Sequence, residues 1–320
     1  MPIRLATPEN IAAAAKVLRS GGLVALPTET VYGLGANALD PVACAGIFAA
    51  KERPFFDPLI VHVADGDMVE QLTTGLGDAA RLLAKRFWPG PLTMVLRKSA
   101  EGVPDIVTSG LPTVAVRMPS HPVALELIRL AGCPVAAPSA NLFGRLSPTT
   151  AEHVADQLGG RADFILDGGP CAVGVESTII DLSGDTPKLL RPGGVSLEQL
   201  QSVLPSIIVV TGSTEQPTAP GQLATHYAPR TPLVIFDEHP PQVSPGQKLG
   251  LLTLRPSPDA HRFAAAVSLS DDGDLAEAAT NLFAALHRLD SANLQAIHAQ
   301  ALPRTGLGRA MMDRLERAQK

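Results

Sequence analysis

The sequence predicts an α/β fold, built on a twisted mixed β-sheet with flanking helices and followed by a smaller C-terminal α/β domain. Short apolar runs typical of buried strands mix irregularly with segments of helical periodicity, which indicates a layered α/β architecture. Hydrophobic residues make up 45% of the 320 residues and charged residues 18%, which is typical of a globular chain. This length suffices for about two domains, each with its own core.

The first predicted helix begins after Thr7, a capping hydroxyl, and carries Pro8 and Glu9 in its first turn. The pair Gly21-Gly22 ends it. Its apolar positions recur at helical spacing and are Ile11, Ala14, Ala15 and Leu18. Strands are predicted next at 22–26, 59–63, 93–96, 113–116, 135–137, 164–166 and 178–182. Helices are predicted between them at 41–50, 78–87, 122–130 and 149–158.

The composition changes after Val210, where residues 211–231 become rich in Thr, Gly, Pro and Gln and show no periodic element. A loop of this length is usually a functional lid or a linker. A second, Rossmann-like α/β pattern follows, with strands at 233–236 and 249–252 and helices at 275–289, 294–299 and 309–318. We therefore predict a catalytic domain at 1–208, a linker at 209–231 and a small domain at 232–320.

The charge and cysteine content narrow the functional classes. A net charge of −5 argues against nucleic acid as the main ligand, because non-specific binding of nucleic acid relies on basic patches. The three cysteines are widely spaced without a metal-binding pattern, so we expect a reducing compartment. No apolar run approaches the ~18 residues of a membrane span. Charged residues also interrupt the N-terminal stretch, so we expect no signal peptide and a cytoplasmic location.

The segment 27–36, PTETVYGLGA, follows the predicted strand 22–26. It places two hydroxyls and a carboxylate at the strand end, where α/β proteins bind ligands. Gly33 and Gly35 would let the backbone approach a neighbour closely. The alternative is an ordinary polar loop with a glycine turn.

Basic residues recur beside strand ends and prolines. Lys51 and Arg53 precede the strand that carries His62, Arg117 ends another strand, and Arg191 lies in LLRPGG. Guanidinium groups in such places can gather around a phosphate or a carboxylate. The alternative for each is a solvated surface charge.

Two further segments carry polar groups. The loop PSANLFGRLSPT offers Ser139, Asn141 and Ser147 to an anion, although Ser147 or Thr149 could instead cap the following helix. The segment GVESTIIDL places Glu176, Ser177 and Thr178 at the start of a strand. His62 and His226 are candidate general bases, or satisfied structural histidines. The common nucleotide, zinc and serine-hydrolase motifs are missing from the sequence, and we expect no metal site.

Taken together, these segments resemble those of the threonylcarbamoyl-AMP synthases, which join a YrdC-like α/β domain to an added C-terminal domain. The matching segments follow in order along essentially the whole chain: PTETVYGLGA, KERPFFDPLIVHV, FWPGPLTMVL, VAVRMPSHP, AAPSANLFGRLSPT, GVESTIIDL, LLRPGG, HYAP and GLGRAMMDRLERA. As a set they are highly specific, whereas each alone is weak.

The resemblance implies an L-threonylcarbamoyladenylate synthase, a nucleotidyltransferase that converts L-threonine, bicarbonate and ATP to threonylcarbamoyl-adenylate and pyrophosphate. ATP would be a substrate, as its Mg²⁺ complex. The product would pass to a partner complex that makes threonylcarbamoyladenosine (t6A) in tRNA, with at most weak tRNA contact by this chain and no membrane.

The resemblance also implies site residues. Threonine would lie among Thr30, His62, Arg117, Ser177 and the backbone of Ala137. ATP would be surrounded by Lys51, Arg53, Asp57, Thr113, Ser139, Asn141, Ser147 and Arg191, under a lid that contains His226 and Tyr227. Lys51, Arg53 and Arg191 would be catalytic, because they would position the reactants and stabilise charge.

Two features depart from the family pattern. Relatives often have asparagine where this chain has Asp57, and a negative charge near phosphates is unfavourable unless it faces a ribose, a base or Mg²⁺. The linker reads APGQLATHYAP, of which only the HYAP end matches well. Two other functions stay open: an RNA-binding module, and a carbamoyl-transfer maturation factor, although such factors carry acylphosphatase and zinc segments that this sequence lacks.

Overall fold

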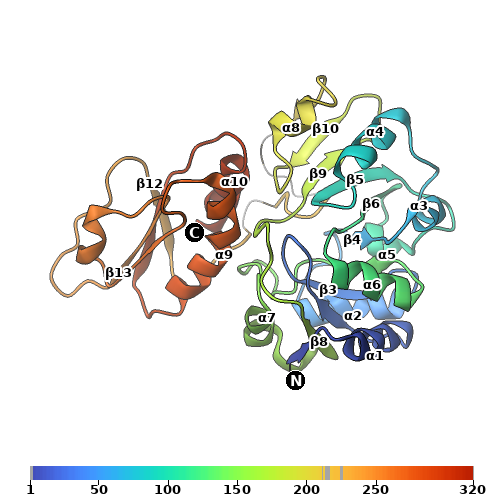
Figure 1. Cartoon of the computed structure of the whole chain (residues 1–320), viewed down its shortest axis with the longest axis horizontal. Coiled ribbons are helices and arrows are strands. Elements are labelled where there is room, and N and C mark those ends of the chain that lie inside the picture. The colour runs from blue at the N-terminus through green and yellow to red at the C-terminus, as the bar shows by residue number, and fades with distance from the viewer. Residues whose placement is uncertain (1–2, 211, 213–216, 224–225, 320) are drawn as a thin grey trace.

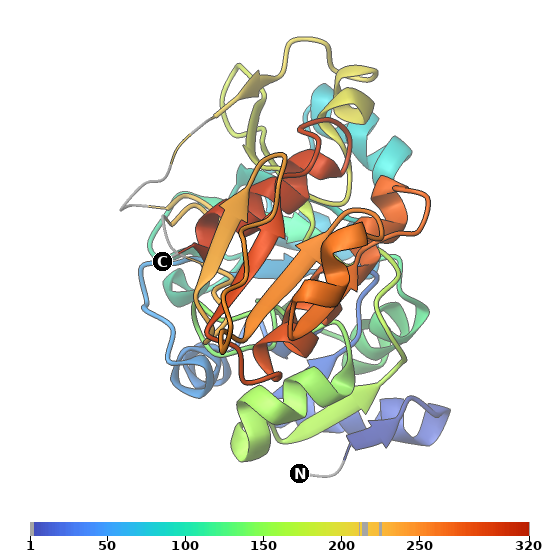
Figure 2. The ribbon, with the colours of Figure 1, turned by 90° about the vertical axis from the view of Figure 1, so that its left-hand side faces the viewer.

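The computed structural model describes residues 3–210, 212, 217–223 and 226–319. These residues form two β-sheets, one of eleven strands in the order β1-β8-β2-β3-β7-β4-β6-β5-β9-β10-β11 and one of four strands in the order β12-β15-β13-β14. The two sheets belong to two bodies that lie side by side, and α9 and α10 face the larger body (Figure 1). A view turned by 90° places the small sheet over the middle of the larger body (Figure 2).

The large sheet is mixed, as predicted. Strand β4 runs parallel to β6 and antiparallel to β7, and β5 runs antiparallel to β6 and parallel to β9. Its strands are β1 (Ile3–Leu5), β2 (Val24–Leu26), β3 (Gly33–Asn37), β4 (Ile60–His62), β5 (Leu92–Arg97), β6 (Thr113–Arg117), β7 (Val135–Ala136), β8 (Phe164–Asp167), β9 (Thr178–Asp181), β10 (Lys188–Arg191) and β11 (Ile208–Val209).

Helices flank this sheet, and their ends follow from capping residues. Thr7 caps α1 through the Asn10 amide, and Thr150 caps α7 through the His153 amide. The helices are α1 (Pro8–Arg19), α2 (Pro41–Lys51), α3 (Gly66–Leu72), α4 (Asp78–Phe87), α5 (Asp105–Thr108), α6 (Pro122–Ala131), α7 (Ala151–Leu158) and α8 (Leu197–Gln201), with a 3-10 turn η1 (Gly159–Arg161). The predicted cap at Ser147 or Thr149 is therefore wrong, because Thr150 takes that position.

The segment after Pro27-Thr28-Glu29-Thr30 differs from the prediction, because residues 33–37 form strand β3 between β2 and β7. Gly35 is close-packed inside the sheet: a Cβ there would lie 2.8 Å from side-chain atoms of both Leu26 and Val135. The absence of a side chain at Gly35 therefore allows the neighbouring strands to pack closely.

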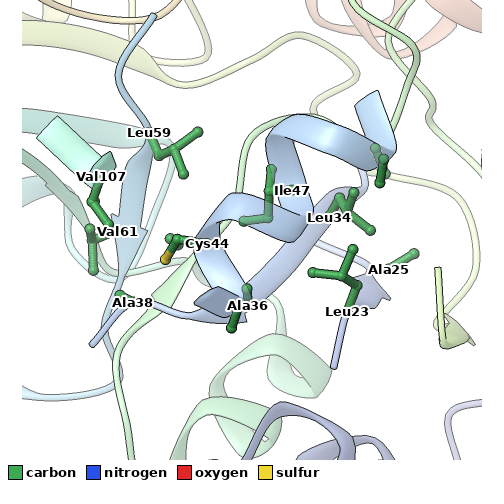
Figure 3. Packing of buried hydrophobic residues seen from close by; sticks show 14 of the residues in the cluster. Leu23, Ala25, Leu34, Ala36, Ala38, Cys44, Ile47, Leu59, Val61 and Val107 are labelled. Carbon is green, nitrogen blue, oxygen red and sulfur yellow. The ribbon is translucent and has the colours of Figure 1, made fainter. Parts of the chain in front are cut away.

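The core of the larger body lies on both faces of the sheet. On one face, Cys44 and Ile47 of α2 pack with Leu34 and Ala36 of β3 (Figure 3). On the other face, α1 and α6 cover a second cluster that includes Leu18, Leu127 and Leu166. All three cysteines are buried and free. In the described part of the chain, no helix is both long and apolar enough to cross a membrane.

The small sheet consists of β12 (Leu233–Phe236), β13 (Leu249–Thr253), β14 (Ala265–Ser268) and β15 (Ala296–Gln300), all paired in parallel. It is accompanied by α9 (Leu275–Asp290), α10 (Gly308–Ala318) and a 3-10 helix η2 (Pro258–Arg262). The helix predicted at 294–299 is wrong: this segment forms β15 between β12 and β13. Its alternate residues Ile297 and Ala299 are buried, and period-two burial is typical of a strand. The Rossmann-like label stays a prediction.

The two bodies share one hydrophobic cluster. Val31, Leu146 and Val175 of the larger body pack with the apolar faces of α9 and α10. Tyr227 of the linker belongs to the same cluster. Burial of this cluster brings α10 next to the strand ends that carry the predicted site. The domain boundaries at 208 and 231 stay a prediction, since the linker is described only in part.

Candidate active site

A single pocket gathers most of the predicted site residues at the ends of β2, β4, β6 and β10. The predicted residues that line it are Thr30, Arg53, His62, Arg117, Ala137, Ser139, Ser177, Arg191, His226 and Tyr227. Residues outside the predicted threonine and ATP sets also line it: Thr28, Val31, Gly33, Ile60, Pro138, Glu176, Pro220 and Gly221. Lys51, Asp57, Thr113, Asn141 and Ser147 do not line it.

One end of the pocket is built around Arg117. The parallel register of β4 and β6 places His62 beside Arg117. Arg117 Nη1 donates to Thr30 Oγ1 at 2.9 Å, and Arg117 Nη2 lies 2.7 Å from Glu29 Oε1. Thr28 Oγ1 lies 2.9 Å from Thr30 Oγ1. A guanidinium, a carboxylate, two hydroxyls and an imidazole thus converge in a buried space.

Burial and neighbouring charges set the protonation states at this end. Burial lowers the pKa of His62 to about 3, and the positive charge of Arg117 adds to this effect, so the imidazole is neutral at neutral pH. Burial alone would raise the pKa of Glu29, but Arg117 outweighs it and the net pKa lies below the ordinary value. Glu29 is therefore an ionised carboxylate.

The other end is built around Arg191, whose guanidinium holds two segments together. Nη2 donates to the Ser177 carbonyl at 2.8 Å and to Ser177 Oγ at 3.2 Å. Nη1 donates to the Pro220 carbonyl of the linker at 3.4 Å. Ser177 Oγ also lies 2.8 Å from Thr93 Oγ1, which fixes its position.

Lys51 is the last residue of α2, and Arg53 comes just after the helix. Glu52 between them adopts a left-handed conformation with φ 56°. Lys51 Nζ donates to the carbonyls of Ser139 and Asn141, so it holds the 139–141 loop beside the pocket. Arg53 donates to the carbonyls of Asp57 and Pro58 at 3.1 and 2.8 Å.

Asp57 forms an ion pair with Arg53, with Nη2 and Oδ2 2.9 Å apart, and its side chain is fully buried. Burial raises the pKa of Asp57, and the cations Arg53, Lys51 and Arg191 partly offset this effect. The carboxylate at this unusual position therefore faces an arginine.

Three other predicted residues lie outside the pocket lining. Ser147 Oγ donates to Glu176 Oε1 at 2.5 Å, and Asn141 Nδ2 donates to the carbonyls of Leu142 and Arg145. Thr113 is the first residue of β6, opposite Arg97 of β5 and at the other end of the strand from Arg117.

The HYAP segment lines the pocket through His226 and Tyr227, and its role as a lid stays a prediction. The His226 amide donates to the Arg317 carbonyl of α10 at 3.0 Å, and the Ala228 amide donates to the Gly144 carbonyl at 2.8 Å. Ala219 packs with a cluster of residues on β4, β5, β6, β9 and β10. This residue, in the part of the linker that departs from the family pattern, is therefore seated on the sheet. Burial lowers the pKa of His226 well below its usual value, and the nearby cations Arg53, Lys51 and Arg191 lower it further.

Some buried basic residues in and around the pocket have a carboxylate partner, and others do not. Arg53 and Arg117 each have a carboxylate partner. Among the described residues, neither Lys51 nor Arg191 forms a salt bridge, although both are at least 95% buried. Arg191 lines the pocket, and a buried cation is costly without a counter-charge, so this end of the pocket favours an anion. Lys51 lies outside the lining and donates to two backbone carbonyls. The described residues contain no group of three or more His, Cys, Asp or Glu that could hold a metal ion.

This arrangement defines an α/β protein with a buried polar pocket at the ends of its sheet strands, one end of which carries a guanidinium without a carboxylate partner among the residues that the structure describes. Comparison with known proteins agrees. The family model described as telomere recombination (Sua5, YciO and YrdC) matches residues 16–193. The model for the C-terminal domain of threonylcarbamoyl-AMP synthase matches residues 195–319.

Full-length relatives extend the match. The threonylcarbamoyl-AMP synthase of Bacillus subtilis is 45% identical, with 97% of this chain and 92% of the relative covered. That of Pyrococcus abyssi is also 45% identical, covering 97% and 94%. The crystal structure of P. abyssi Sua5 complexed with L-threonine has a TM-score of 0.92 at 43% identity, covering 99% and 97%. The chain therefore belongs to the threonylcarbamoyl-AMP synthase family, in its two-domain Sua5 form.

Sequence reasoning gave no binding role to Glu29 or Glu176 and missed Arg314 of α10, which pairs with Glu176. Both glutamates lie within the motifs that were singled out, so their positions were available. Arg314 also lies in a matched segment, GLGRAMMDRLERA, but which arginine of that segment turns inward follows from how α10 packs.

Proposed function

We propose that this chain synthesises L-threonylcarbamoyl-adenylate from L-threonine, bicarbonate and ATP with release of pyrophosphate, as a nucleotidyltransferase that supplies t6A formation in tRNA. The observation that carries this proposal is the buried guanidinium of Arg191, which lines the pocket without a carboxylate partner in the described part of the chain, with Lys51 holding the 139–141 loop next to it. The Arg191 end adjoins a separate end lined by Thr30, His62 and Arg117. A polyphosphate and an amino acid fit these two ends.

Threonine would occupy the Arg117 end. Arg117 would bind the carboxylate, Glu29 would face the amine, and Thr30 and the neutral His62 would hydrogen-bond the remaining polar groups. The Ala137 amide already donates to the Ile60 carbonyl, so this residue would contribute its carbonyl oxygen. Ser177 would lie between threonine and the nucleotide. The complex of P. abyssi Sua5 with L-threonine supports threonine as the amino acid.

ATP would occupy the end with Arg53, Ser139 and Arg191, under His226 and Tyr227. Arg191 would contact the phosphates directly. Lys51 would either keep the 139–141 loop in place or exchange one carbonyl for a phosphate oxygen. Asn141 and Ser147 would act by fixing the loop, and Asp57 by pairing with Arg53. We propose that Mg²⁺ arrives with the triphosphate.

The chemistry needs no covalent enzyme intermediate. Bicarbonate takes up a proton and loses water to give CO₂. The neutral threonine amine attacks the carbon of CO₂ and releases a proton, which leaves a carbamate. A carbamate oxygen then attacks the α-phosphorus, the bond to the β-phosphate oxygen breaks, and pyrophosphate leaves. Arg53 and Arg191 would stabilise the negative charge that builds up on the phosphates. A closed lid would keep water from the labile carbamate.

The test is pyrophosphate release by the purified protein, with ATP present and threonine or bicarbonate omitted in turn. We expect release only when all three substrates are present, and label from ¹⁴C-bicarbonate in the adenylate product. Release of pyrophosphate at the same rate with and without threonine would contradict the proposal. Absence of release together with salt-sensitive tRNA binding in a gel shift would favour the RNA-binding alternative.

A further inference from the structure

Helix α10 of the small body reaches the wall of the pocket through one residue, Arg314. Its side chain is fully buried, and its Nε lies 2.8 Å from Glu176 Oε2. The other oxygen of Glu176 accepts the hydrogen bond from Ser147 Oγ. Glu176 lines the pocket immediately before Ser177, so a carboxylate of the wall is held by the other body.

Arg314 also touches the lid. Its guanidinium carbon lies 5.0 Å from the centre of the Tyr227 ring, a cation–π distance. Tyr227 is buried, has a left-handed backbone with φ 62°, and lies 5.9 Å from the Phe283 ring of α9. A non-glycine residue in this backbone conformation must be held by its surroundings. The ring contacts with Arg314 and Phe283 supply that support.

A short ion network orients Arg314 itself. Asp313 contacts Arg314 Nη1 through one oxygen, and its other oxygen lies 2.9 Å from Arg317 Nε. Arg317 in turn donates to the Leu223 carbonyl of the linker, and its own carbonyl accepts from the His226 amide. The last turn of α10 therefore contacts the linker at two places, Leu223 and His226.

We propose that Arg314 is a positioning residue for the synthase reaction: it fixes Glu176 and Tyr227 at once, so that the C-terminal domain completes the nucleotide end of the site. This inference rests on the proposed function. Removal of Arg314 leaves Glu176 as a buried carboxylate with one hydrogen bond and frees one face of Tyr227. A buried charge that loses its partner moves toward water, which displaces the wall and opens the lid.

The chain offers a matched control on the same helix. Arg309 also forms an ion pair between the two bodies, with Nη2 3.7 Å from Glu198 Oε1 of α8. That pair is partly exposed, with 34% and 49% of the side chains accessible. Exposed pairs contribute little, so Arg309→Met removes an ion pair between the bodies without touching the pocket.

The test compares Arg314→Met, Arg314→Lys and Arg309→Met by hydrogen exchange and kinetics. In Arg314→Met, we expect the amides of His226 and Ala228 to exchange roughly tenfold faster or more, while amides of β6 keep their protection. The KM for ATP should rise by roughly tenfold, whereas threonine affinity, measured by calorimetry, should change by less than about threefold. Arg314→Lys should restore part of each effect, and Arg309→Met should match the unmodified protein.

Equal exchange in Arg314→Met and Arg309→Met would overturn the proposal. Faster exchange of all amides alike would also overturn it, since that marks a general loss of stability. If Arg314→Met does not fold, Glu176→Gln breaks the same pair from the other side and should give the same local exchange. A protein that releases no pyrophosphate would refute the proposed function, while the exchange experiment would still decide the role of Arg314.

Discussion

Arg117 and Glu29 form a buried ion pair at the Arg117 end of the pocket, with Nη2 and Oε1 2.7 Å apart. The same guanidinium donates to Thr30, so one arginine organises the PTET segment from the end of β6. A buried pair is costly to break from one side, because the remaining charge has no partner. Under the proposed function, threonine binding and local stability would therefore both depend on Arg117.

Arg117→Met should weaken threonine binding by at least roughly tenfold and lower the free energy of unfolding by about 3 kcal/mol, because Glu29 stays buried and unpaired. Calorimetry with threonine and urea unfolding measure the two effects. Arg97→Met, at the exposed end of β5, is the control. Unchanged threonine affinity would remove Arg117 from the site.

Asp57→Asn should lower the KM for ATP several-fold. The substitution keeps the shape of the side chain and removes the negative charge that now neutralises Arg53 at 2.9 Å, so the anion end becomes more positive. Initial rates at varied ATP concentrations measure this. Asp105→Asn, which removes an exposed carboxylate paired with Lys98, should have no effect. A higher KM would show that Asp57 contributes favourably to nucleotide binding.

Gly193→Ala should destabilise the protein by about 1–3 kcal/mol and reduce turnover. A Cβ there would lie 2.3 Å from the Glu176 carbonyl and 2.4 Å from backbone atoms of Ser177 and Thr178, none of which can move without shifting the pocket wall. Thermal unfolding and rate measurements test this. Gly184→Ala meets no atom within 4 Å and serves as the control. Equal behaviour of both variants would contradict the packing argument.

Acid should destabilise the contact between the two bodies. His153 of α7 and His287 of α9 stack with ring centres 3.9 Å apart. Burial, then the neighbouring His153, lowers the pKa of His287 to about 4. Because the folded pKa lies below the unfolded value of 6.5, the unfolded chain binds more protons between these values. This contribution is fully present above pH 6.5 and is lost as pH falls toward 4.

Urea unfolding at several pH values between about 7 and 5 measures this slope, to which His287 contributes up to about 1.4 kcal/mol per pH unit. Glu152 and Asp156 of α7, Asp290 of α9 and Arg230 surround the pair and modulate it. His287→Gln should make the slope shallower, whereas the exposed His239→Gln should not. A slope that is the same in all three proteins would refute the assignment to His287.

Local signals in the sequence were sufficient for much of the fold. Thr7, Pro8 and Glu9 start α1 as predicted, because caps act within a few residues of chain. The prediction failed at 294–299, where a short apolar run is compatible with either a helix or a buried parallel strand. Only pairing with β12 and β13 decides between them. It also failed at 33–37, because glycines rarely indicate a strand and β3 depends on packing against Leu26 and Val135.

The sequence by itself determined the family and most of the residues that line the pocket, because each motif is a short run whose side chains leave a strand or loop together. The tertiary structure decided which of those groups are partners. Asp57 lies against Arg53, Lys51 holds the carbonyls of the 139–141 loop, and Arg314 reaches Glu176 from the other body. Such pairings depend on distances between segments far apart in the chain, which are set by burial of a shared core and are not encoded in any single motif.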